Sequence, residues 1–197
     1  MGSGANGDGE EGPATFRAAV ASLRGADVDA AVTLRETAAP VRLAPYAFAL
    51  AADVLDGEDE LASGRFILLY DPSGQEAWDG DVRVVAFATA AVEEEIGRDP
   101  LLPEVGWAWL VDALAARQAS YRAEAGTVTS TTSARFGAMA TEPKGCDLEL
   151  RCSWTPAGDA GELSRHLDAF CDVLCAMAGL PPAQPGVARL PLRRGAG

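Results

Sequence analysis

Residues 99–117, DPLLPEVGWAWLVDALAAR, constrain the fold most, because they predict a helix that is apolar on two sides. At about 100° per residue, one apolar stripe contains Leu102, Val105, Trp109, Ala113 and Ala116. The second stripe, on roughly the other side, contains Trp107, Leu110, Val111 and Leu114. A surface helix needs only one such stripe to contact the core. The second must therefore be covered by more of the same chain or by another molecule, and it predicts an interaction surface.

A tryptophan outside residues 99–117 is a further candidate for this predicted interaction surface. Trp78 lies in a loop between two expected strands, and Trp107 lies on the second stripe. Aromatic residues are enriched among the residues that dominate binding energy at protein interfaces. Trp78 therefore joins the second stripe as a candidate contact for a partner, with a core position as the alternative for each tryptophan.

Composition limits the classes of protein that the chain can belong to. Its 197 residues, of which 48% are hydrophobic, are enough for one domain with a substantial core. A formal net charge of −13 would repel phosphate, so we expect no nucleic-acid partner. No apolar run approaches the roughly 20 residues that span a bilayer, and MGSGANGDGEEG lacks the basic and hydrophobic parts of a secretion signal. These features predict a cytoplasmic protein without a membrane partner.

The pattern of elements predicts an α+β domain over residues 13–182, between a disordered acidic tail (1–12) and an irregular tail (183–197) that carries Arg189, Arg193 and Arg194. Hydrophobic periodicity predicts helices over 13–24, 99–117 and 162–178. It predicts strands over 28–35, 65–70, 82–89, 127–136 and 147–154. Residues 39–55 are expected to be extended at their prolines and helical after Pro45.

The resulting order, α-β-β-β-α-β-β-α, predicts an antiparallel sheet of about five strands with helices on one side. This order resembles the type III secretion chaperone-like fold. The resemblance implies a homodimer that binds extended segments of other proteins.

Motifs for catalysis, nucleotides and metals are missing from the sequence. No GxGxxG follows a predicted strand, and neither GxxxxGK[ST] nor GxSxG occurs. The cysteines form two pairs, Cys146 with Cys152 and Cys171 with Cys175, at spacings unlike those of zinc sites. The single histidine, His166, lies on another side of its helix from Cys171 and Cys175. We therefore expect buried structural thiols, and neither a metal nor a cofactor.

A row of hydroxyl groups gives the best candidate for a polar binding face. Thr127, Thr129, Thr131 and Ser133 share one face of their predicted strand. An ordinary exposed sheet face is the alternative interpretation. If this strand lies at the edge of the sheet, it can also accept a strand from another chain.

Several long blocks of the chain resemble a known family. They are RLAPYAFALAADV (42–54), GRFILLYDPSGQEAWDG (64–80), DPLLPEVGWAWLVDAL (99–114), GTVTSTTSARFG (126–137), LELRCSWTP (148–156) and AGLPP (178–182). They are similar to the actinobacterial family catalogued as domain of unknown function 3000, over about residues 14–194. The resemblance implies a cytosolic single-domain protein and carries no activity, cofactor or catalytic residue.

Two functional hypotheses follow. The first is a non-enzymatic protein-interaction or chaperone-like module that acts as a homodimer and uses the face around Trp107, Leu110, Val111 and Leu114. The alternative is a small-molecule-binding protein or enzyme with a pocket between sheet and helices, built from Tyr46, Tyr70, Trp78 and carboxylates such as Asp71. Without a nucleophile–base pair in the sequence, we favour the interaction module.

Overall fold

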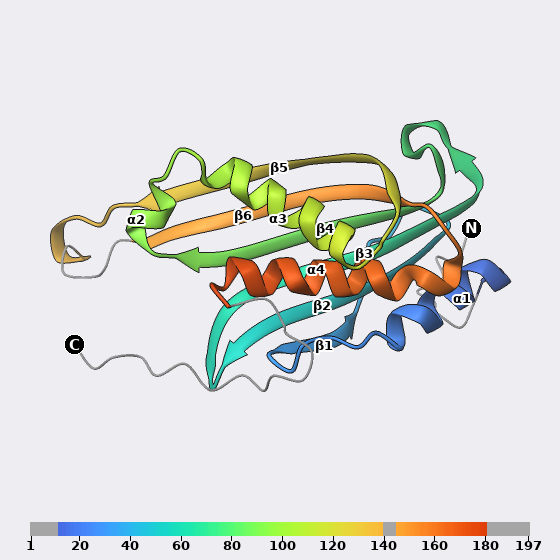
Figure 1. The fold of residues 1–197 in the computed structure, drawn as a ribbon, viewed down its shortest axis with the longest axis horizontal. Coiled ribbons are helices and arrows are strands. Elements are labelled where there is room, and N and C mark those ends of the chain that lie inside the picture. Colours follow the sequence, from blue (N-terminus) through green and yellow to red (C-terminus); the bar gives the residue numbers. More distant parts are fainter. Residues whose placement is uncertain (1–11, 140–144, 181–197) are drawn as a thin grey trace.

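A six-stranded antiparallel sheet organises the part of the chain that the computed structural model describes, residues 12–139 and 145–180. The strand order is β1-β2-β3-β4-β6-β5, so β1 and β5 are the two edge strands (Figure 1). The strands are β1 (Val32–Thr37), β2 (Tyr46–Asp56), β3 (Asp59–Gln75), β4 (Gly80–Val92), β5 (Tyr121–Ser133) and β6 (Gly145–Pro156). Three successive hairpins form β1 to β4. Strands β5 and β6 form a further hairpin, and its β6 strand pairs with β4.

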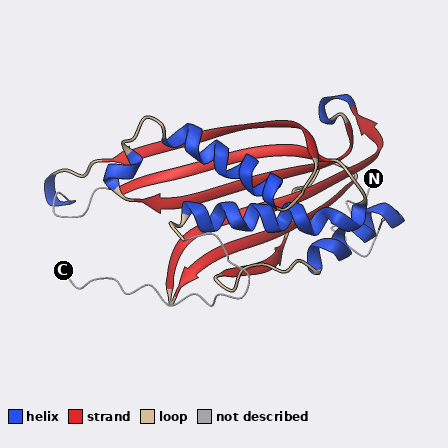
Figure 2. Cartoon of the chain, in the orientation of Figure 1, coloured by secondary structure: helices blue, strands red, loops and turns tan. Residues whose placement is uncertain are grey.

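The helices lie on one face of this sheet in the described chain (Figure 2). They are α1 (Ala14–Arg24), α2 (Glu94–Gly97), α3 (Leu102–Ala116) and α4 (Leu163–Met177), with short 3-10 turns at η1 (Glu76–Trp78), η2 (Gly137–Met139) and η3 (Ala160–Glu162). The predicted α+β class is confirmed, and each of the three longer predicted helices agrees with an observed one within a few residues. The other face of the sheet carries no described helix.

The predicted count of about five strands is wrong, because residues 46–56 form β2 and not a helix. Alanine favours helix, which suggested a helix in YAFALAADVLD. The chain alternates instead, with Phe48, Leu50, Ala52 and Val54 buried towards the helices. The intervening side chains are mostly alanine, so the alternation of apolar and polar residues that identifies a strand is absent. Pairing with β1 and β3 on both sides decides the conformation, and the element order becomes one strand longer than predicted.

The core lies between the sheet and α4, and a glycine permits the close approach. Phe66 packs against Phe170 of α4, with ring centroids 5.8 Å apart, and against Trp154 at 6.3 Å. A Cβ atom at Gly64 would lie 2.6 Å from the Phe87 carbonyl oxygen and 2.7 Å from the Phe170 ring. Any side chain at residue 64 would therefore push α4 away from the sheet.

The predicted tails fall almost wholly outside the described residues, as do Arg189, Arg193 and Arg194. Within the described ranges, no helix combines the length and the apolar character that crossing a bilayer requires.

Candidate interaction surface

Strand β5 is an edge strand of the sheet. Among residues 12–139 and 145–180 its one pairing partner is β6, and it is exposed at nearly every residue from Tyr121 to Ser133. Between Arg122 and Ala125 the pairing is irregular, and Ala123 has a positive φ of 53°. From Ala125 to Ser133 the ladder with β6 runs without interruption. The strand predicted at 127–136 is observed at Tyr121–Ser133 and is an edge strand, as strand addition requires.

Helix α3 covers the helix-side surface of β5. A Cβ atom at Gly106 would lie 3.1 Å from a Val128 methyl group, and one at Gly126 would lie 2.6 Å from the Trp107 ring. The Trp107 side of α3 therefore lies over β5. Helix α3 also lies beside α4, because Arg117, the residue after α3, forms a bidentate ion pair with Asp172 of α4, with N–O distances of 2.6 and 2.8 Å.

The two predicted apolar stripes of residues 99–117 merge into one broad buried face with two partly exposed flanks. Leu102, Gly106, Leu110 and Leu114 are the buried residues of α3. Leu110 and Leu114 are each 1% exposed, so the structure places these two candidate interface residues in the core. Trp107 and Val111 are partly buried; Trp107 lies over Gly126 of β5, and Val111 follows one turn later on the same side of the helix. Only these two residues of the second stripe remain accessible to a partner.

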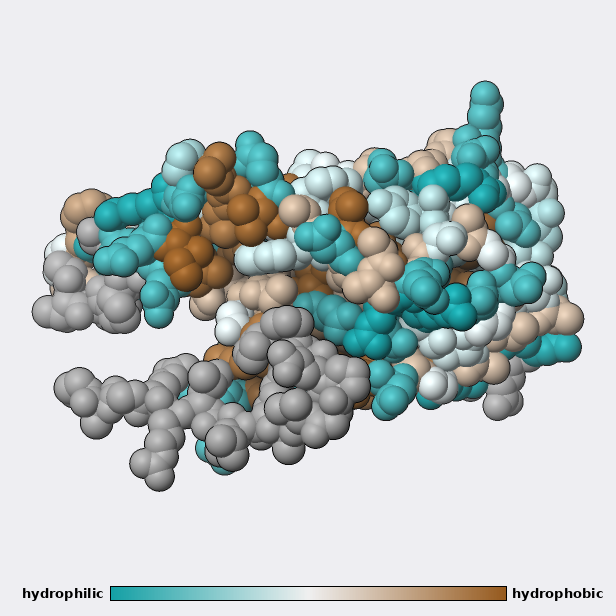
Figure 3. Space-filling model, in the orientation of Figure 1, coloured by the Kyte–Doolittle hydropathy of each residue, from teal (hydrophilic) through white to brown (hydrophobic). Residues whose placement is uncertain are grey.

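A further apolar area lies at the beginning of α3. Ile96, Leu101 and Val105 are exposed to 48%, 62% and 42% of their surface. In Figure 3 the strongly hydrophobic colour gathers over α2 and the start of α3, as located in Figure 1. Periodicity alone could not separate this area from the core stripe, since Leu102 is buried and its neighbour Leu101 is not.

The hydroxyl row lies on the face of the sheet that has no described helix. Val128 faces the helices, so the residues of alternate register point the other way, and Thr127, Thr129, Thr131 and Ser133 are all exposed. Three of them lie beside charged residues of β6: Thr127 pairs with Arg151, Thr129 with Glu149 and Thr131 with Asp147. The predicted polar face is thus an accessible surface, while its use in binding stays a prediction.

Arginines cross the middle of this uncovered face. Strand register places Arg35, Arg65 and Arg151 in one row, with Ala51 and Phe87 between them. Arg151 lies over the Phe87 ring, 5.5 Å from its centroid, and also pairs with Glu149 at 2.6 Å. Arg65 donates to the Ala38 carbonyl, and its buried Nε has no hydrogen-bond partner. The face therefore combines an aromatic ring with cationic groups on a chain of net charge −13.

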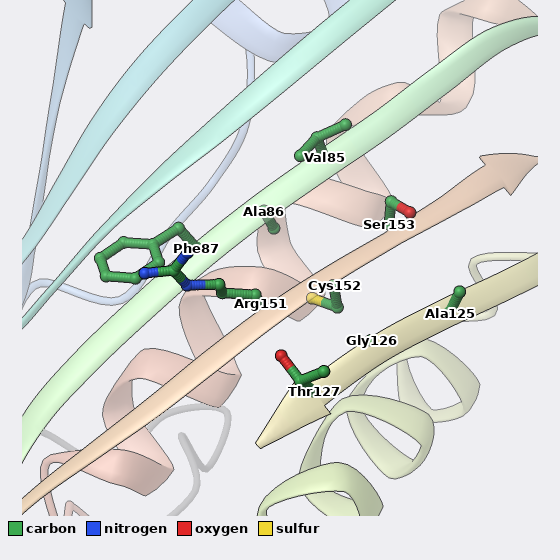
Figure 4. A pocket seen from close by; sticks show the side chains of 9 residues that line it. All are labelled: Val85, Ala86, Phe87, Ala125, Gly126, Thr127, Arg151, Cys152 and Ser153. Atoms are coloured by element: carbon green, nitrogen blue, oxygen red, sulfur yellow. The ribbon is translucent and has the colours of Figure 1, made fainter. Parts of the chain in front are cut away.

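A shallow cavity of about 660 Å³ lies on this face, over β4, β6 and β5. Figure 4 shows the cluster of Phe87 and Arg151 at one end of the lining and Val85 and Ser153 at the other. Its apolar floor and its guanidinium group suit a ligand or a protein side chain that has an apolar part and an anionic group. The sequence held no signal for this cavity, because it is formed where β4 pairs with β6 of a hairpin that lies far from β4 in the sequence.

The residues of the alternative small-molecule hypothesis, Tyr46, Tyr70, Trp78 and Asp71, do not line the cavity over β4, β6 and β5. Tyr46 and Tyr70 pack with Phe16 of α1, at centroid distances of 5.6 and 6.2 Å from its ring. The carboxylate of Asp71 accepts hydrogen bonds from Ser73 and Gln75 in its own turn, and these bonds lower its pKa. The space between helices and sheet here is filled by aromatic core.

Trp78 is separate from the α3 surface. It is partly buried at the tip of the β3–β4 hairpin, and its carbonyl oxygen accepts a hydrogen bond from Thr155. Arg122 at the start of β5 also contacts this hairpin tip, because it donates a hydrogen bond to the Asp79 carbonyl at 2.8 Å. Trp78 therefore lies beside the irregular end of β5, whereas Trp107 lies over its regular part.

Groups that commonly carry nucleophilic chemistry are buried. All four cysteines are buried, as predicted, and none forms a disulfide in the part of the chain that the structure describes; burial raises the pKa of Cys152 to about 12. His166 is only 3% exposed, and burial lowers its pKa to about 4. Among the described residues, no group of three or more His, Cys, Asp or Glu side chains is placed to hold a metal ion.

The fold and these surfaces define an α+β protein with an open antiparallel sheet, helices on one face in the described chain, and a long unpaired edge strand beside an apolar helix flank. The chain belongs to the family described as protein of unknown function DUF3000, whose model matches residues 12–188. This confirms the family expected from the sequence blocks. A comparison with curated proteins found no match, and neither did a comparison with solved structures. The resemblance to the type III secretion chaperone-like fold therefore stays a prediction.

Proposed function

We propose that this protein is a non-enzymatic protein-interaction module, chaperone-like in binding extended segments, that acts as a homodimer in the cytoplasm. The observation that carries the proposal is the free edge of β5 beside the partly exposed side chains of Trp107 and Val111. An unpaired edge offers backbone hydrogen bonds, and an adjacent apolar flank offers area to bury. Together they supply both contributions that strand addition uses.

Binding is a better proposal than catalysis for the described residues. A thiol is nucleophilic as the thiolate, and burial raises the pKa of both Cys152 and Cys171. His166 already accepts a hydrogen bond from the Trp154 indole N–H at 3.1 Å and is shielded from solvent. These groups support the fold, while the accessible features are a strand edge, an arginine-bearing sheet face and apolar flanks.

The test is the solution mass of the purified full chain, measured by light scattering across a concentration series. We expect a dimer for the wild type and a folded monomer for Trp107→Asp, because the carboxylate would be buried at the interface without a partner. Val111→Asp provides a second variant in case Trp107→Asp fails to fold. Circular dichroism of each variant reports whether it is folded.

The matched control is Val105→Asp, which makes the same change on the opposite flank of α3. Val105 is 42% exposed, so this variant is expected to stay folded and dimeric. A wild type that is monomeric at every concentration would overturn the homodimer. A control that dissociates as completely as Trp107→Asp would move the interface to the area around Ile96 and Leu101.

A further inference from the structure

The two edge strands of the sheet differ in how well they are protected against pairing. Strand β1 has six residues and carries Arg35 and Glu36, which is the usual protection of an edge. The segment Ala125–Ser133 of β5, AGTVTSTTS, has no charged residue and no proline, and its ladder with β6 is uninterrupted. The irregularity and the charges of Arg122 and Glu124 lie just before it. The regular segment is therefore the part of the sheet most able to accept another strand.

We propose that Ala125–Ser133 pairs antiparallel with the same segment of a second copy, about a two-fold axis at Thr129. This inference deepens the proposed function and rests on it. The register centred on Thr129 is the one that pairs the whole regular segment. It places Thr127 opposite Thr131 of the second copy and Val128 opposite Ser130. Every contact then occurs twice, as a two-fold interface requires.

The chemistry of the segment fits a second copy. Each chain has a net charge of −13, yet the segment brings no like charges face to face, because it has none. Cross-strand pairs of threonine are favourable in antiparallel sheets. At each end, Glu124 of one copy comes beside Ala134 and Arg135 of the other, which places opposite charges near each other.

Helix α3 supplies the apolar part of the same interface. Because residue 106 is glycine, the helix lies close to Val128, and a Cβ atom at 106 would be 3.1 Å from its methyl group. The Trp107 and Val111 flank therefore lies next to the new ladder, where it meets the flank of the second copy. This explains why an edge strand and a partly exposed tryptophan occur together.

The pairing also creates a larger binding face. Two six-stranded sheets joined through β5 form one continuous sheet, and their uncovered faces become one surface. The cavity over β4, β6 and β5 lies beside the joined edge, so the dimer carries two such cavities on one face of the joined sheet, one on each side of the two-fold axis. An extended client segment could contact both.

The experiment uses paired charges at Thr127 and Thr131, which are exposed and face each other only across the proposed interface. In Thr127→Glu/Thr131→Lys each new charge lies next to an opposite charge on β6, Arg151 or Asp147, and opposite its complement in the second copy. In Thr127→Glu/Thr131→Glu the new carboxylates face each other. The dimer dissociation constant, measured by sedimentation, is expected to be roughly tenfold weaker for the Glu/Glu variant than for the Glu/Lys variant.

The control places the same change on the other edge strand. Thr33 and Thr37 of β1 are exposed and four residues apart, so Thr33→Glu/Thr37→Glu has the same net charge as the Glu/Glu variant. It is expected to dimerise as the wild type does. If Trp107→Asp dissociates the dimer while the Glu/Glu and Glu/Lys variants have equal dissociation constants, the β5 register is wrong and the proposed function stands. A wild type that is always monomeric overturns both.

Discussion

At the scale of single residues, two titratable side chains on α4 oppose each other in their effect on stability. His166 is held neutral, since burial and the nearby Arg165 charge lower its pKa to about 4 from an ordinary 6.5. Asp168 is partly buried, and burial raises its pKa to about 6 from 3.8. Between pH 6.5 and about 4, the unfolded chain binds a proton at His166 that the folded chain does not bind, so acidification lowers stability through this residue. The folded chain binds the extra proton at Asp168, which raises stability on acidification.

Replacing Asp168 separates the two contributions. The buried Oδ1 of Asp168 has no hydrogen-bond partner, and the ionised group lies near Asp172. We expect Asp168→Asn to raise the free energy of unfolding by on the order of 1–2 kcal/mol above pH 7, where the native carboxylate is charged. The gain is expected to shrink as the pH falls from about 6 to 3.8 and to disappear at still lower pH, where the carboxyl group is protonated in both states. Urea denaturation of both proteins across this range measures the difference.

Asp172→Asn is the comparison for that experiment. It breaks the two-pronged pair with Arg117 that joins α3 to α4, so it is expected to lower stability at pH 7. An Asp168→Asn protein that is less stable than the wild type at pH 7 would mean that the attraction between the Asp168 carboxylate and Arg117 outweighs the cost of burying it.

At the scale of elements, Arg83 links β4 to the irregular part of β5. Its side chain is 7% exposed and reaches from β4 across β6 to β5. It donates to the Ala123 carbonyl at 2.7 Å, to Thr155 at 3.1 Å and to Ser153 at 2.8 Å. These three acceptors, a carbonyl and two hydroxyl groups, carry no charge. Burial of the guanidinium lowers the pKa of Arg83. The guanidinium thus holds the positive-φ residue Ala123 in place, next to the regular segment.

We expect Arg83→Met to lower the free energy of unfolding by about 1–3 kcal/mol, because three hydrogen bonds are lost and their acceptors stay partly buried. Hydrogen exchange should accelerate at Arg122–Ala125 before it does elsewhere in β5. Arg98→Met is the control: its ion pair with Glu94 lies at the surface, so its loss should change stability little. Unchanged exchange around Ala123 would contradict the role given to Arg83.

At the scale of the whole molecule, charge acts against self-association. Two copies of net charge −13 repel each other, while the proposed interface itself has few charges. At moderate ionic strength, screening largely removes this repulsion between exposed charges that are more than about 10 Å apart. We therefore expect the dimer dissociation constant to fall as sodium chloride is added. Dissociation by salt would indicate an interface held mainly by ion pairs and would count against the uncharged β5 edge.

Much of the fold could be predicted from local patterns. The stripe of Leu163, Leu167, Phe170 and Leu174 predicts α4, and all four side chains are buried. The alternation of Leu148, Leu150, Cys152 and Trp154 predicts β6 in the same way. Strand β2 was missed because its uncovered side is made of small apolar residues, which remove the polar half of the signal. Its partners on both sides are needed to identify it.

The sequence by itself determined the α+β class, the family and the periodicity that makes each longer helix pack against a sheet, because these depend on neighbours along the chain. It could not divide the second stripe of α3, which tertiary packing separates into core at Leu110 and Leu114 and an accessible flank at Trp107 and Val111. Nor could it tell which strand lies at an edge or which arginines share a row. Those relations depend on strand order and register, which only the packing of distant segments decides.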